Sequence, residues 1–200
     1  MTQPGTLNIG GMVQQSIEVI TKPSVMTFER YERSGTAREA FIYVGLAAVI
    51  GALLKAVFSL HGGATYAVGS AVVTLISTLL GFFVFTFVVN WAGRQFFQGT
   101  GTYDEVAYTF ALFYAPLALI GAVLGSIPVL GWLIGLAVLV GNVYFGYLAV
   151  QSSMNLRDTG QAIILLVIGA VAVWIVSAVI GGIFTALLLG GALMSGAFGH

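Results

Sequence analysis

Residues 106–156 read VAYTFALFYAPLALIGAVLGSIPVLGWLIGLAVLVGNVYFGYLAVQSSMNL and contain no Asp, Glu, Lys or Arg. One bilayer crossing takes about 20 predominantly apolar residues, so this stretch is long enough for two crossings. Ser126-Ile127-Pro128 supplies the break between them, because proline fits the first turn of a helix and removes a backbone hydrogen bond deeper inside. The stretch therefore predicts two membrane-spanning helices joined by a short turn.

The composition of the whole chain agrees with this interpretation. The 200 residues are 58% hydrophobic and 7% charged, whereas a soluble domain is about 45–50% apolar and about 25% charged. A soluble core could not bury so much apolar surface, so a cytosolic enzyme is a poor fit. The high apolar and low charged content also argues against a disordered chain and a nucleic-acid binder. Seven basic residues balance seven acidic ones, and the chain has no cysteine. Net charge therefore identifies no partner, and disulfides and zinc-thiolate sites are excluded.

Three further charge-free runs, 40–54, 56–93 and 159–200, complete the pattern. The sequence predicts an all-α integral membrane protein, a bundle of five transmembrane helices preceded by an amphipathic interfacial helix. The third helix has a capping box at Thr102 and Glu105, and the fifth begins at Asp158-Thr159. A turn at His61-Gly62-Gly63 separates the first two. The spans are expected at about 39–60, 66–92, 105–125, 128–151 and 161–186, forming one domain over 39–186 with an external tail at 187–200.

Residues 1–38 are predicted to form a cytoplasmic amphipathic segment. Apolar residues recur at helical spacing in Ile9, Val13, Ile17 and Ile20, and Pro23 opens a second short helix that contains Phe28. We expect residues 11–33 to lie along the membrane, with Val13, Ile17, Ile20 and Phe28 in the headgroup zone or against the bundle. The charged residues of the second helix form a candidate partner-binding surface, although a merely solvated face is the alternative. These residues are Glu29, Arg30, Glu32 and Arg33.

The loop charges predict the orientation. With five spans, the N-terminal segment and the loops at 93–104 and 152–160 share one side, which holds every basic residue except Lys55. An excess of Lys and Arg marks the cytoplasmic side of a membrane protein. We therefore expect a multi-pass protein of the cytoplasmic membrane, with a cytoplasmic N-terminus and an external C-terminus.

Lys55 and Asn142 are candidate polar residues inside the membrane. Burying a lysine at the bilayer centre costs at least about 2.5–3.5 kcal/mol, so such a residue suggests a function by default. Lys55 lies near the outer end of its span, however, and its four-carbon stem can reach the headgroups. A snorkelling lysine and a transport or ligand site both remain open. Asn142 is the most polar residue deep in the bilayer, so a polar pathway should pass it.

Small and hydroxyl-bearing residues form stripes along the predicted spans. Small residues let helices approach closely in lipid, and hydroxyl or amide groups can bond across the contact. These stripes are candidate helix-packing or interface positions, and the alternative is the lining of a polar path through the bundle. They are Ser70, Thr74 and Ser77; Gly121 and Gly125; and Gly131, Gly135, Asn142 and Gly146.

Two short strings resemble pieces of aspartyl proteases. Asp158-Thr159-Gly160 matches the tripeptide around a protease carboxylate, and Tyr103-Asp104 matches a tyrosine-aspartate pair of intramembrane proteases. That chemistry needs two carboxylates that share a proton. Both acids lie at predicted helix starts, where capping explains them. No other catalytic motif occurs, so we predict no catalytic residue, no metal site and no cofactor.

The order of parts resembles the Yip-domain family, the Ypt-interacting membrane proteins, and specifically its prokaryotic branch. The resemblance covers roughly residues 15–180. It is carried by the amphipathic segment 20–31, by the loop 98–103 leading to Tyr114-Ala-Pro116, and by the turn 153–162 before the last span. It implies five spans with a cytoplasmic N-terminus. Eukaryotic members bind Rab-type small GTPases, but their Asp-Leu-Tyr-Gly-Pro motif does not occur here, so small-GTPase binding is not carried over.

Two functional hypotheses follow. The first is a non-enzymatic membrane protein that acts as a scaffold, a partner-binding subunit or a membrane-organising factor. Its partners would be the lipid bilayer and other membrane proteins or a second copy of itself, and not nucleic acid. The alternative is a small transporter or channel with a polar path near Asn142 and the stripe of Ser70, Thr74 and Ser77. A wet cavity that reaches Asn142 would favour the transporter.

Overall fold

All regular secondary structure is helical over the residues that the structure, a computed structural model, describes. These are residues 8–125, 127 and 130–197, with the backbone alone for 184–185 and 187–197. The elements are α1 (Ile9–Thr21), α2 (Val25–Tyr31), α3 (Ala37–Phe58), η1 (Leu60–Gly62), α4 (Ala64–Phe96), α5 (Tyr103–Leu124), α6 (Leu130–Ser153) and α7 (Thr159–Ala197). Five of the helices described are long and apolar enough to cross a membrane. The predicted fold class is confirmed.

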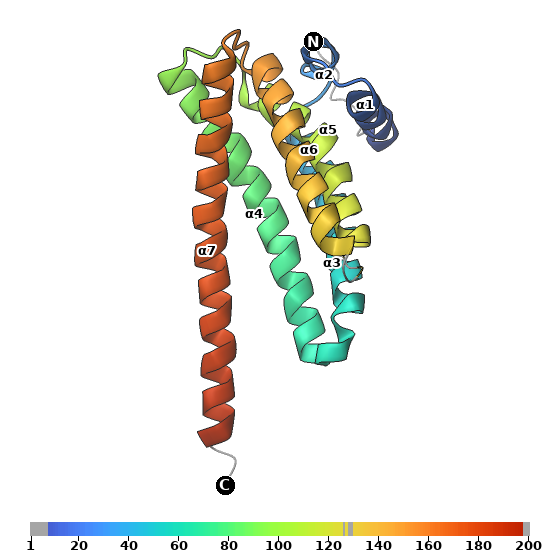
Figure 1. The fold of residues 1–200 in the computed structure, drawn as a ribbon, viewed down its shortest axis with the longest axis vertical. Helices are drawn as coiled ribbons and strands as arrows, with labels where there is room; N and C mark the ends of the chain where they lie inside the picture. The colour runs from blue at the N-terminus through green and yellow to red at the C-terminus, as the bar shows by residue number, and fades with distance from the viewer. Residues whose placement is uncertain (1–7, 126, 128–129, 198–200) are drawn as a thin grey trace.

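The five long helices form a bundle (Figure 1). Helix α3 packs on α4 and α5, α6 packs on α5, and α7 packs mainly on α4. Helix α5 is the most buried of the five, and its aromatic side chains fill the centre. Phe110 contacts Phe85 of α4, and Phe113 contacts Phe145 of α6. Figure 1 also shows that α6 and α7 lie close at one end of the bundle and separate toward the other.

The helix starts follow from local sequence chemistry. At Thr102 and Glu105 the predicted capping box is present, and Thr36 and Glu39 form a second one that was not predicted. Each pair satisfies two of the backbone N–H groups that a helix start leaves free. Asp158 accepts a 2.7 Å hydrogen bond from the Gly160 N–H at the start of α7. The predicted turn between the first two spans is η1 followed by Gly63, whose φ of 93° favours glycine.

Helix α7 is longer than the fifth span expected at 161–186. It runs without interruption through Ala197 and includes the glycine pairs Gly181-Gly182 and Gly190-Gly191. Apolar surroundings offer the backbone no other hydrogen-bond partners, so a membrane helix tolerates glycine better than a soluble one. Most of the tail expected at 187–200 therefore continues the helix, and 198–200 lie outside the described residues. The break expected at 126–128 falls between α5 and α6, although residues 126 and 128 are also outside that description.

One end of the bundle holds almost all of the charge, and we call it the polar end. Helices α1 and α2, the loop between α4 and α5 and the loop between α6 and α7 gather there, and η1 lies at the opposite end (Figure 1). Every acidic residue and every basic residue except Lys55 belongs to these segments or to the adjoining helix ends.

Candidate interface at the polar end of the bundle

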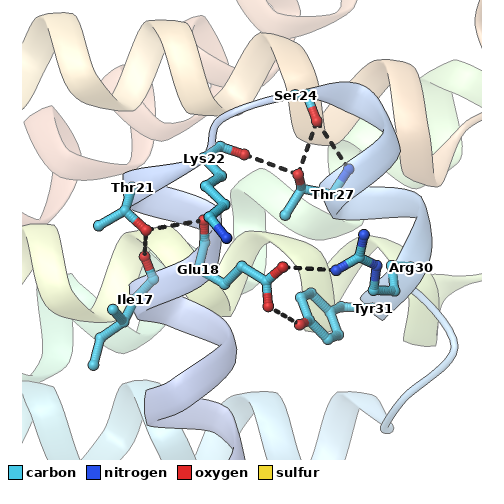
Figure 2. Close-up of polar contacts among 8 residues, drawn as sticks. All are labelled: Ile17, Glu18, Thr21, Lys22, Ser24, Thr27, Arg30 and Tyr31. Carbon is cyan, nitrogen blue, oxygen red and sulfur yellow. Dashed lines mark hydrogen bonds and ion pairs between the residues drawn. The ribbon is translucent and has the colours of Figure 1, made fainter.

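Helices α1 and α2 form a helical pair that is tied together by polar side chains. Figure 2 shows the Glu18 carboxylate of α1 between two residues of α2. It accepts a 2.6 Å hydrogen bond from the Arg30 guanidinium and a second from the Tyr31 hydroxyl. The Tyr31 hydroxyl and the positive charge of Arg30 hold the pKa of Glu18 below its usual value. Thr27 closes the turn between the helices by donating to the Lys22 carbonyl at 2.8 Å.

The face of α1 that packs on the bundle differs from the expected one. Met12, Ser16 and Val19 are buried, whereas Val13 and Ile17 are 42% and 57% exposed. The structure therefore does not place Val13 and Ile17 against the bundle, and their position in the headgroup zone stays a prediction. Phe28 of α2 does pack on the bundle, edge to face with Phe113 at 6.2 Å between ring centres.

Hydrogen bonds at the side of α1 fix the helical pair to α3 and α5. The Tyr108 hydroxyl of α5 donates to the Gln15 side-chain oxygen at 2.8 Å. The Ser16 and Tyr43 hydroxyls lie 3.0 Å apart and share a hydrogen bond. Each links residues far apart in sequence, so no local pattern indicates it.

The segment that follows α2 is joined to α5 and α6, and the start of α3 is joined to α5. Glu32 is only 7% exposed, and its carboxylate accepts a 3.0 Å hydrogen bond from the Ser152 hydroxyl of α6. Arg33 donates to Glu105 at 3.0 Å. The backbone N–H at the start of α3 donates to Asp104 at 2.8 Å. Burial raises the pKa of Glu32, because a carboxylate shielded from water is costly to ionise.

The two loops at the polar end pack closely on each other. A Cβ on Gly101 would lie 1.8 Å from the Ser153 carbonyl oxygen, and one on Gly99 would lie 2.5 Å from the Met154 side chain. Asn155 donates to the Thr100 hydroxyl at 3.0 Å. Asn155 and Gln98 both have positive φ angles, near 54° and 55°. Such angles cost a side-chain-bearing residue energy, so the loop packing holds them in place.

The four candidate partner-binding residues do not form one free surface. Glu32 is buried against Ser152, Arg30 pairs with Glu18 and Arg33 pairs with Glu105. Glu29 is exposed. Other exposed cations at the polar end make no ion pair with any residue that the structure describes. They are Lys22, Arg38, Arg94 and Arg157.

The glycine stripes divide into packed and open positions. A Cβ on Gly146 would meet Leu166 of α7 at 2.9 Å, and one on Gly121 would meet Val138 of α6 at 3.8 Å. Gly125 and Gly131 lie against backbone at the turn between α5 and α6, where a Cβ would come within 2.3 Å of a carbonyl oxygen. A Cβ on Gly135 would meet no atom of the described residues within 4 Å. Gly135 therefore makes no close contact among the described residues, and a role at an interface with another chain stays a prediction.

The polar members of the stripes bond to their own helices. Ser70 and Thr74 donate to carbonyls of α4 at 2.9 and 2.8 Å, and the Asn142 amide donates to the Val138 carbonyl at 2.9 Å. Ser77 is partly buried. These bonds satisfy the donors without joining two helices. Lys55 is exposed in the last turn of α3, away from the polar end, where a snorkelling side chain fits.

A cavity of about 380 Å³ lies beside Asn142, between α4, α5, α6 and α7. Its walls are mainly aromatic and aliphatic, and they do not include Ser70, Thr74, Ser77 or Lys55. The structure therefore does not bring the candidate polar residues together around this cavity as a transport path would require.

These features define a polytopic helical membrane protein with an ordered polar end. A family model described as the Yip1 domain matches residues 17–180, and the chain belongs to that family. The match confirms the resemblance to the family, and the assignment to its prokaryotic branch stays a prediction. No curated protein and no solved structure matches the chain.

Proposed function

We propose that the protein is a non-enzymatic scaffold of the cytoplasmic membrane of a prokaryote, and that it binds partner proteins through its polar end. In this proposal the polar end is cytoplasmic and the opposite end is external, in accord with the excess of basic residues there. The observation that carries the proposal is the rigid construction of this end. Hydrogen bonds that involve α1, α5 and α6, together with close loop packing, hold in place the segments that carry its exposed charges.

The distribution of ion pairs gives the surface its chemistry. Most of the acidic side chains are used within the chain as helix caps, ion pairs or buried acceptors. Arg38, Arg94 and Arg157 carry charges that no described residue pairs with. An exposed basic surface favours a partner segment rich in Asp and Glu, because complementary charge steers association.

The hydrogen bonds that the aspartate side chains accept within the chain also support a non-enzymatic role. Asp104 accepts from the start of α3, and Asp158 accepts from Gly160 at the start of α7. Asp158 thus acts as a cap of α7, whereas Asp104 bonds to the start of α3 and α5 is capped by Thr102 and Glu105.

Site-specific photocrosslinking in native membranes tests the proposal. A photoreactive amino acid would replace Arg94 or Arg157 at the polar end, and His61 at the opposite end as the matched control. We expect discrete protein adducts from the two polar-end positions and none from His61. Adducts with lipid alone at Arg94 and Arg157 would show a charged end that only anchors in headgroups, and would contradict the scaffold.

A further inference from the structure

The cavity beside Asn142 lies about midway along the long apolar helices. Its walls come from the central parts of four spans, including Phe82 and Phe85 of α4, Phe110 and Phe113 of α5, and Ala170 of α7. Its lining also includes Leu139 and Val143 of α6, which are exposed on the outside of the bundle. Trp174 at its rim is 72% exposed. A molecule dissolved in the bilayer could therefore enter it laterally.

Three polar side chains line this otherwise apolar space. They are Tyr114, Asn142 and Ser177. The Tyr114 and Ser177 hydroxyls have no hydrogen-bond partner among the described residues, and the Asn142 amide uses only its N–H donor, on the Val138 carbonyl. Two hydroxyls and one carbonyl oxygen therefore keep free bonding capacity inside the membrane. There the surrounding lipid tails offer no partner, so each such group is costly unless a ligand or water satisfies it.

The lining also defines what the occupant must be. No charged side chain contributes to the walls, so an ionised group would be left unpaired in a medium that penalises it. Ring faces and aliphatic chains dominate, and the volume of about 380 Å³ is within the usual range of small-molecule sites. An apolar chain that ends in one neutral group able to donate and accept a hydrogen bond would complement both parts.

We propose that this cavity binds an uncharged, membrane-dissolved amphiphile of the long-chain alcohol type. Its hydroxyl would exchange hydrogen bonds with Tyr114 and Asn142, and its chain would lie among the phenylalanine rings. This site is separate from the polar end and does not depend on the scaffold proposal.

Photolabelling in nanodiscs of phosphatidylcholine tests the site. The probe is hexadecanol with a mid-chain diazirine, and unlabelled hexadecanol and hexadecane are the competitors. We expect saturable labelling of peptides that contain the cavity walls. Hexadecanol should suppress it by about tenfold more than hexadecane at equal concentration, because hexadecane has no hydroxyl for the polar groups.

Three variants separate the cavity from the general lipid surface. Ala170→Phe fills the cavity, Tyr114→Phe with Asn142→Leu removes polar groups, and Val140→Phe on the lipid-facing side of α6 is the matched control. We expect Ala170→Phe to abolish saturable labelling and Val140→Phe to retain it. The Tyr114/Asn142 double variant should remove the preference for hexadecanol over hexadecane, which keeps the test valid if Ala170→Phe does not fold. Non-saturable labelling in the unmodified protein, or equal competition by the two compounds, would overturn the proposal and indicate a space filled by bulk lipid or water.

Discussion

The Ser152 hydroxyl at the end of α6 donates a 3.0 Å hydrogen bond to the Glu32 carboxylate, although the two residues lie 120 positions apart in the chain. Ser152 is fully buried and Glu32 is nearly so. The contact joins the segment after α2 to the last turn of the fourth span. It therefore couples the placement of the N-terminal helical pair to the folding of the bundle.

Replacing Glu32 tests this coupling. Glu32→Gln keeps a side-chain oxygen for the Ser152 hydroxyl and removes the charge, so thermal stability at pH 7 should stay equal or rise. Glu32→Ala leaves the buried Ser152 donor without a partner, which should cost about 1–3 kcal/mol. Thermal unfolding in detergent measures both. Equal destabilisation by the two variants would contradict an acceptor role for Glu32.

The same residue gives a signed dependence on pH. The folded-state pKa of Glu32 is raised above its usual 4.5, so the folded state binds a proton more tightly than the unfolded state. The stabilisation from this group is complete below about pH 4.5 and is lost as the pH rises through the raised folded value. The difference in unfolding temperature between Glu32→Gln and the unmodified protein should therefore grow in favour of Gln as the pH increases from 4 to 8.

Glu18 should produce the opposite pH dependence in the helical pair. Its pKa is lowered, first by the hydrogen bond from Tyr31 and then by the nearby positive charges. The stabilisation that ionised Glu18 gives to the folded state is therefore present above about pH 4.5. It is lost as the pH falls through the lowered pKa that Glu18 has in the folded state. Tyr31→Phe removes the hydrogen bond that is the main cause of the lowered Glu18 pKa. Amide exchange across Ile9–Thr21 at neutral pH should therefore increase. Unchanged exchange would show that packing of Met12 and Val19 alone holds α1 in place.

Glycine substitutions should distinguish the packed loops from the open stripe. Gly101→Ala places a methyl group against the Ser153 carbonyl oxygen, a backbone atom that cannot move without shifting the loop. Overpacking of this kind costs about 1–3 kcal/mol. Gly135→Ala meets open space within the chain and serves as the control, with unchanged or slightly higher thermal stability because alanine favours helix. A loss of stability at Gly135 in detergent would instead indicate that a second copy covers this face.

The charge-free runs were sufficient to predict the number of spans, because the need for about 20 apolar residues per crossing is a property of the bilayer and not of tertiary contacts. The capping box at Thr102 and Glu105 was predictable for a similar reason, since it is formed by four consecutive residues. Features that depend on local chemistry or on the solvent could thus be read from the sequence alone.

Faces and partners could not be predicted in this way. The Ile9-Val13-Ile17 period identifies an apolar face of α1, but beside a membrane such a face can lie in lipid while small and polar residues contact protein. The structure buries Ser16 and leaves Val13 and Ile17 exposed. Likewise, Gly135 and Gly146 share one stripe, and only Gly146 meets α7, because the two helices separate along their length (Figure 1). Spacing defines a stripe, whereas the path of the neighbouring helix decides which residues it touches.

Cysteine labelling should establish the orientation of the bundle. The chain contains no cysteine, so Lys22→Cys and Arg157→Cys at the polar end and His61→Cys at the opposite end each introduce a single thiol at an exposed position. The excess of basic residues at the polar end predicts that it is cytoplasmic. A membrane-impermeant maleimide added to intact cells should therefore label only His61→Cys, and the other two variants should react only after the membrane is permeabilised. Labelling of Lys22→Cys and Arg157→Cys in intact cells, with His61→Cys protected, would place the polar end outside and would remove the basis for a cytoplasmic scaffold.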